Sequence, residues 1–297
     1  MYKAHFGLRE HPFGITPDTS FFFACATYQE ALNTLVIAAQ NGEGFIKITG
    51  EVGTGKTMLC RKFMGSLDAG FVTAYIPNPY LEPHTLTLAL ADELEVVLEK
   101  DADQYHILKA INLRLLDLAR DGKKVLLCID EAQAMPIETL EALRLLTNLE
   151  TEKRKLLQIV MFGQPELDRK LQRKEIRQLN QRITFHYHLG ALSLDDMNFY
   201  LSHRLAIAGF SGGRLFSLSA MQTLHKASGG IPRLINILAH KSLMVAYGQG
   251  KQQVQAAHVR AAAEDTGAAR RLSWMRSVAA GLMSGIAACG AVWVYLR

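Results

Sequence analysis

Residues 50–57 read Gly50-Glu51-Val52-Gly53-Thr54-Gly55-Lys56-Thr57 and fit the pattern G-x-x-x-x-G-K-[ST] of a phosphate-binding loop. In such a loop the glycines let backbone N–H groups curl around phosphates at the positive end of the following helix. An apolar run over 45–49 predicts a strand before the loop, and residues 58–67 predict a helix after it, which is the context that the loop requires. We therefore expect residues 50–57 to bind a nucleotide, with Lys56 at its β- and γ-phosphates and Thr57 as a ligand of Mg²⁺.

A second pattern is an apolar strand that ends in two carboxylates. Residues 124–129 (KVLLCI) predict the strand, and Asp130 and Glu131 follow it directly. One carboxylate at such a strand end can bind Mg²⁺ while the other polarises an attacking water. We assign the metal to Asp130 and the water to Glu131, because the carboxylate that activates water must not itself coordinate the metal. The second carboxylate favours hydrolysis of the nucleotide over binding alone.

Predicted strands and helices alternate up to residue 189, and only helices follow. This order indicates an α/β fold in which helices cover both faces of a parallel sheet, with a small helical domain after it. The predicted strands span 45–49, 71–76, 124–129, 157–162 and 183–189. The predicted helices span 28–40, 58–67, 104–120, 138–149 and 166–179 in the first domain, and then 194–208, 218–228, 231–247 and 254–265.

The C-terminal stretch 277–296 carries no charged residue over twenty positions. A helix of that length spans about 30 Å, the thickness of the hydrocarbon core of a bilayer. We expect a single membrane helix here; the other interpretation is a buried or partner-binding helix. Within it, Gly281-x-x-x-Gly285 has the spacing that lets two membrane helices approach closely, although lipid-facing glycines fit equally well. The parts of the chain are then an arm (1–24), an α/β core (25–190), a helical domain (191–266), a basic linker (267–276) and a membrane helix (277–296).

Charge is unevenly distributed along the chain. Of the net charge of +5, more than half comes from residues 260–297, which contain five arginines and two acidic residues. Arg270, Arg271 and Arg276 lie just before the apolar stretch and only Arg297 follows it, so the positive-inside rule keeps the body of the chain in the cytoplasm. The rest of the chain is close to neutral, which argues against nucleic acid as a partner. Four widely spaced cysteines exclude a disulfide scaffold and a zinc knuckle.

Together these motifs resemble the AAA+ family of ATPases, in which Walker A and Walker B motifs bind ATP and Mg²⁺. The resemblance implies that Gln164, after the fourth strand, acts as sensor 1. It implies that Arg182 is the arginine finger for a neighbouring subunit, with Arg177 as the alternative. Arg233, in the phrase GGIPR, looks like the sensor 2 arginine of the helical lid domain. The resemblance also implies a ring-like homo-oligomer, because in this family an arginine from one subunit completes the active site of its neighbour.

Longer phrases resemble the ExeA/GspA group of membrane-anchored ATPases from secretion and pilus assembly. They are FGLREHPFGITPDTSFFF, GEVGTGKT, LLCIDEAQ, EALRLLTNLET and SGGIPRLIN, and the likeness extends over most of residues 1–265. It implies partners among the inner-membrane components of a type IV pilus or secretion system. ExeA-type members continue past the membrane into a periplasmic peptidoglycan-binding domain, whereas this sequence ends at Arg297, so no cell-wall-binding role is expected.

Two other functions use the same core. A DNA-engaged AAA+ ATPase of the replication or transposition loader type shares the nucleotide motifs and the helical lid, and would bind DNA with a steep dependence on salt. A nucleotide-dependent scaffold would change shape without useful turnover, and an intact Glu131 argues against that interpretation.

Overall fold

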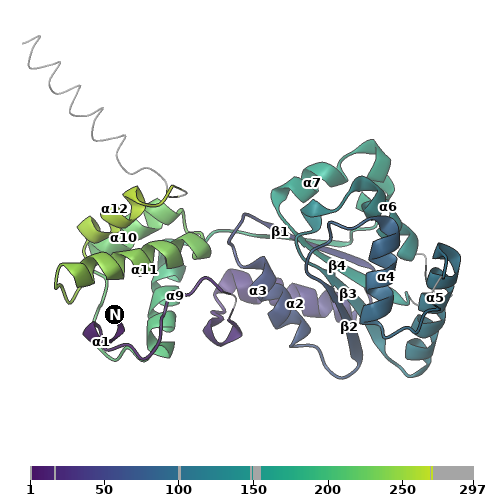
Figure 1. Ribbon diagram of the computed structural model, residues 1–297, viewed down its shortest axis with the longest axis horizontal. Coiled ribbons are helices and arrows are strands. Elements are labelled where there is room, and N and C mark those ends of the chain that lie inside the picture. The colour runs from purple at the N-terminus through teal and green to yellow at the C-terminus, as the bar shows by residue number, and fades with distance from the viewer. Residues whose placement is uncertain are drawn as a thin grey trace, which may run out of the picture. The chain divides into compact units, whose positions relative to one another are not determined.

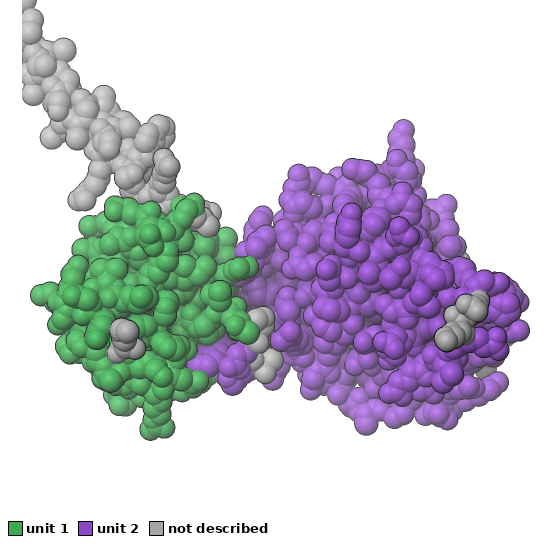
Figure 2. Space-filling model, in the orientation of Figure 1, with its two compact units in different colours: residues 1–16, 192–297 green, residues 17–191 purple. Residues whose placement is uncertain are grey.

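The chain folds into two compact units (Figures 1 and 2). The computed structural model describes residues 2–16, 18–99, 102–147, 149, 155–267 and 269. One unit comprises residues 17–191, and the other combines residues 1–16 with the chain from Leu192 onward. The expected arm is thus divided between the units.

The expected membrane helix over 277–296 and its Gly281-x-x-x-Gly285 motif lie outside the residues that the structure describes, as does most of the expected basic linker. Within the described ranges, no helix combines the length and the apolar character needed to cross a membrane.

The larger unit contains a five-stranded parallel sheet. Its strands are β1 (Phe45–Gly50), β2 (Phe71–Ile76), β3 (Lys124–Ile129), β4 (Leu157–Gly163) and β5 (Phe185–Leu189). Their order across the sheet is β2-β3-β4-β1-β5. Every residue of β1 and β4 is buried. Strand β4 is accordingly a nearly continuous apolar run, whereas β1 also buries Lys47 and Thr49. The predicted parallel sheet and the helices that follow it are confirmed.

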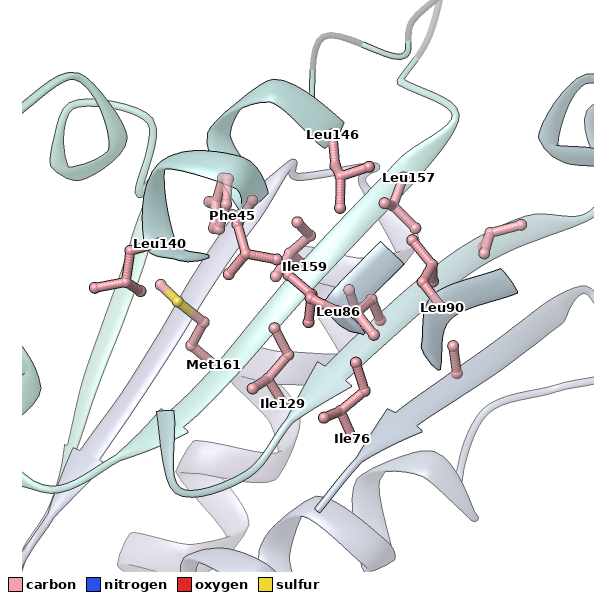
Figure 3. Close-up of a cluster of buried hydrophobic side chains, with 14 of the residues drawn as sticks. Phe45, Ile76, Leu86, Leu90, Ile129, Leu140, Leu146, Leu157, Ile159 and Met161 are labelled. Carbon is pink, nitrogen blue, oxygen red and sulfur yellow. The ribbon is translucent and has the colours of Figure 1, made fainter. Parts of the chain in front are cut away.

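Helices cover both faces of this sheet (Figure 1). On one face lie α2 (Ala26–Gln40) and α3 (Lys56–Met64), and on the other lie α4 (Pro83–Glu93), α5 (Gln104–Arg120), α6 (Ile137–Leu146), α7 (Pro165–Leu171) and α8 (Arg177–Asn180). Short 3₁₀ turns are η1 (Thr19–Phe21), η2 (Ala132–Ala134) and η3 (Lys174–Ile176). Figure 3 shows the buried cluster on the second face, where strand residues such as Ile129, Ile159 and Met161 meet Leu86 and Leu90 of α4.

One predicted helix, 166–179, is interrupted in the structure. It ends at Leu171 and the chain resumes as η3 and α8. Leu171 and Ile176 are both buried but are five residues apart, a spacing that would turn Ile176 away from the core in a continuous helix. The break returns Ile176 to the core. Helix α4 was not among the predicted helices, although its first residue is a proline suited to a helix start.

The smaller unit is helical. It contains α1 (Tyr2–His5), α9 (Leu194–Ile207), α10 (Leu218–Ser228), α11 (Pro232–Gly248) and α12 (Ala256–Glu264). Two of these helices begin at a serine whose hydroxyl accepts a backbone N–H, Ser193 for α9 and Ser217 for α10, at 3.1 Å in each case. Such caps satisfy N–H groups that the helix itself leaves unpaired.

A buried arginine holds the N-terminal segment in the smaller unit. Arg204, on α9, is only 6% exposed. Its Nε donates to the Pro12 carbonyl at 2.5 Å and its Nη2 to the Gly14 carbonyl at 3.3 Å. Beside it, the ring centroids of Phe13 and Phe216 lie 6.1 Å apart. Residues 2–16 therefore pack as an integral part of the smaller unit.

Replacing this arginine should destabilise the smaller unit. In Arg204→Met the two carbonyls lose a charged donor, and we expect the free energy of unfolding to fall by about 2–3 kcal/mol. Denaturant unfolding, together with the rate of proteolysis near the N-terminus, measures the effect. Arg214→Met, at an exposed position of the same unit, is the matched control and should change little. Equal stability of the two variants would contradict this role of Arg204.

Candidate active site

The loop between β1 and α3 takes a conformation that only glycine adopts easily. Gly53 and Gly55 have φ values of +83° and +96°. A side chain at Gly55 would also collide with the hydroxyl of Tyr28, and a Cβ at Gly50 would lie 2.6 Å from the Leu189 carbonyl oxygen. Of the two glycines in the loop pattern, Gly55 is thus required by both backbone angle and space, and Gly50 by space.

Lys56, the first residue of α3, is held against this loop. Its Nζ donates to the carbonyl oxygens of Gly50 at 2.8 Å and Glu51 at 3.0 Å, and the residue is 4% exposed. Burial lowers the pKa of Lys56, and the nearby charges of Glu131 and Asp130 oppose that shift. The Lys56 ammonium group therefore lies against the loop, at a position from which it could contact the phosphates of a nucleotide.

A hydrogen bond links the start of α3 to the end of β3. The Thr57 hydroxyl donates to Oδ2 of Asp130 at 2.6 Å. Asp130 is 2% exposed, and its other oxygen accepts the backbone N–H of Glu131 at 2.9 Å. Burial raises the pKa of Asp130, whereas the hydrogen bonds from Thr57 and Glu131 lower it.

The pair of Thr57 and Asp130 fits a magnesium ion. Mg²⁺ prefers hard oxygen ligands, commonly one or two protein groups completed by water and phosphate oxygens. A hydroxyl and a carboxylate meet here in a buried position, and a cation would offset the cost of burying the Asp130 charge.

Glu131 stands on strained backbone and is held by two amides. Its φ of +51° lies in the left-handed region, which costs an ordinary residue on the order of 1–3 kcal/mol. Its Oε2 accepts hydrogen bonds from Gln133 Nε2 at 2.5 Å and from Gln164 Nε2 at 3.0 Å. The structure thus brings Gln164 to Glu131 at the carboxyl edge of the sheet.

Gln133 was not singled out from the sequence. It lies in η2, and its Oε1 accepts the backbone N–H of Gln164 at 2.9 Å. A polar side chain two residues after Glu131, in the run Asp-Glu-Ala-Gln, was the available signal. Lys170 was also missed, and its Nζ donates to the carbonyls of Gln133 and Met135 at 2.5 and 2.8 Å.

The three candidate arginines occupy different surroundings. The Arg182 guanidinium donates to the Arg144 carbonyl at 3.2 Å and to the Thr147 hydroxyl at 2.5 Å, where it caps the C-terminus of α6. Arg177 is exposed at the start of α8. Arg233 is exposed in the first turn of α11, in the smaller unit.

Comparison with known proteins supports an AAA domain. Residues 39–171 match the family described as AAA domain. The chain is 43% identical over 254 residues to General secretion pathway protein A of Aeromonas hydrophila. That alignment covers 86% of this chain and 46% of the relative, so the chain spans less than half of the relative's length.

Solved structures with low sequence identity share the fold. Cdc6p from Pyrobaculum aerophilum has a TM-score of 0.64 at 18% identity, over 84% of this chain and 71% of that one. Drosophila ORC bound to DNA has a TM-score of 0.62 at 17% identity, over 86% and 63%. The RuvB branch migration motor of Thermotoga maritima has a TM-score of 0.55 at 14% identity, over 86% and 73%. The chain thus has the AAA ATPase fold.

A side chain at Gly55 should disable the loop. In Gly55→Ala the left-handed backbone alone costs about 1–2 kcal/mol, and the clash with Tyr28 adds to it. We expect a lower unfolding midpoint and a loss of nucleotide binding, followed with a fluorescent ATP analogue.

Adding Tyr28→Phe to Gly55→Ala removes the hydroxyl that clashes and leaves the backbone strain. This double variant should recover part of the lost stability, whereas Tyr28→Phe alone serves as the matched control. No recovery in the double variant would contradict the steric clash between the added methyl group and the Tyr28 hydroxyl.

Proposed function

We propose that this chain is an ATP hydrolase, anchored in the bacterial inner membrane, that supports assembly of a type IV pilus or a type II secretion-like system. The observation that carries hydrolysis is the Glu131 carboxylate, which two amides hold beside Lys56 and the Thr57–Asp130 pair. The 43% identity to General secretion pathway protein A supports the secretion-type role.

The residues of the site then have distinct tasks. The loop 50–57 binds the phosphates, with Lys56 at the β- and γ-phosphates. Thr57 and Asp130 would hold Mg²⁺, which would supply positive charge to stabilise the phosphate oxygens. Glu131 takes the proton of the water whose oxygen bonds to the γ-phosphorus, while the bond to the β–γ bridging oxygen breaks and ADP leaves. Gln164 orients the reacting groups.

Arginines complete the site in this proposal. Arg182 serves as the finger for a neighbouring subunit, with Arg177 as the alternative, and Arg233 contacts the phosphates from the helical lid domain. The exposed position of Arg177 favours it as a group free to meet another subunit, whereas Arg182 already caps α6. The active form is a homo-oligomer, in a ring.

The cellular role follows from the resemblance at the level of sequence. Within the ExeA/GspA group we propose the role of MshM of the MSHA type IV pilus system, on the sequence phrases that the chain shares with that group. The catalytic body then lies in the cytoplasm, a single C-terminal helix crosses the inner membrane, and inner-membrane pilus or secretion components are the partners.

Glu131→Gln tests hydrolysis. The amide keeps the size of the side chain but cannot accept a proton, so the turnover of ATP should fall by a factor of about 100 or more. ATP affinity should change by less than about threefold. Phosphate release and equilibrium binding measure the two quantities. Glu138→Gln, an exposed position on α6, is the control; turnover equal to wild type in Glu131→Gln would refute the assignment.

Carbonate extraction of membranes tests the anchor. The full chain should stay in the pellet, because a spanning helix resists alkaline extraction, and a chain that stops after Thr266 should appear in the supernatant. Release of the full chain, together with salt-sensitive DNA binding, would instead favour the DNA-loader function.

A further inference from the structure

The Glu131 carboxylate is held by only one of its two oxygens. Gln133 Nε2 and Gln164 Nε2 both donate to Oε2, at 2.5 and 3.0 Å. A carboxylate oxygen offers two acceptor sites, so two donors occupy Oε2. No donor among the described residues contacts Oε1, which leaves that oxygen for a water molecule.

The orientation of the Gln133 amide follows from its neighbours. Its Oε1 accepts the Gln164 backbone N–H at 2.9 Å, so its NH₂ end must face Glu131. An amide carries a donor and an acceptor at fixed separation, and this position uses both. A carboxylate would lack the donor and an aliphatic side chain would lack both.

The backbone of Gln133 is anchored to the same corner of the fold. Lys170, on α7, donates to the carbonyls of Gln133 and Met135. The helix α7 begins directly after Gln164. Side chain and backbone of Gln133 are thus both tied to the segment that joins β4 to α7.

We infer that Gln133 is a positioning residue for ATP hydrolysis: its side-chain amide connects the end of β4 to the Glu131 carboxylate and turns the free carboxylate oxygen toward water. This inference rests on the proposed function of Glu131. It also means that a displacement of Gln164 changes the placement of Glu131 through two hydrogen bonds, one from each glutamine.

Gln133→Leu removes both hydrogen bonds at similar volume. We expect kcat for ATP to fall by about 10- to 100-fold, with KM and nucleotide affinity within about threefold of wild type. Gln172→Leu, at an exposed position just after α7, is the matched control and should keep wild-type kinetics. An unchanged kcat in Gln133→Leu would overturn the inference.

The combination with Glu131→Gln shows whether Gln133 acts through Glu131. If it does, adding Gln133→Leu to Glu131→Gln should leave the residual rate unchanged, because the group being positioned is already disabled. A further drop by the same factor as in the wild-type background would mean independent action and would overturn the inference. If Glu131→Gln alone turns over at the wild-type rate, the proposed function fails instead.

Gln133→Glu separates positioning from packing, because it keeps the size and the acceptor and replaces only the donor. We expect kcat to fall about 10- to 100-fold, as in Gln133→Leu, with KM within about threefold of wild type, because the introduced carboxylate repels Glu131 and cannot donate to it. A wild-type kcat in Gln133→Glu would indicate that only the packing of this side chain matters and would contradict the inference. This variant also serves as the test if Gln133→Leu does not fold.

Discussion

The hydrogen bond from the Thr57 hydroxyl to Asp130 joins two segments that follow strands which are not neighbours. Thr57 comes after β1 and Asp130 after β3, and β4 lies between these strands. Parallel strands all end at the same edge of the sheet, so the loops after them converge there. The intervening strand then delivers Gln164 between the phosphate loop and the carboxylates. Strand order therefore determines which side chains can meet.

Charged groups are concentrated where the sheet excludes water. Lys56 and Asp130 are both almost fully buried, and burial lowers the pKa of the first and raises that of the second. Buried charges are costly unless they are paired and hydrogen-bonded. Here each is hydrogen-bonded to the chain, and their opposite charges partly offset the cost. The left-handed backbone of Glu131 is likewise unfavourable by itself, and the surrounding fold stabilises it at the residue proposed to activate water.

The sequence predicted the central strands β3 and β4 well because nearly all of their residues are buried in the sheet and few are polar. It also predicted the phosphate loop, whose glycines are required by local backbone geometry. The prediction of one continuous helix over 166–179 was wrong. The break between Leu171 and Ile176 lets both side chains enter a core most of whose other residues come from distant parts of the sequence. Gln133 could not be assigned for a similar reason: its role depends on the Gln164 backbone, and a hydrogen bond across 31 residues leaves no periodic signal.

The smaller unit is discontinuous, since the chain leaves it after residue 16 and returns at Leu192. A ribosome produces residues 2–16 before the larger unit, yet Arg204, Phe216 and Asn236, which contact that segment, are made only after it. During synthesis residues 2–16 therefore wait for these native neighbours, whereas the α/β unit can already bury its core. The helical unit can thus be completed only after the α/β unit has been made, by a segment, residues 2–16, that must remain available until α9, α10 and α11 have been synthesised. Folding of the smaller unit therefore depends on contacts between residues far apart in the sequence, such as Pro12 and Arg204, which are separated by 192 positions.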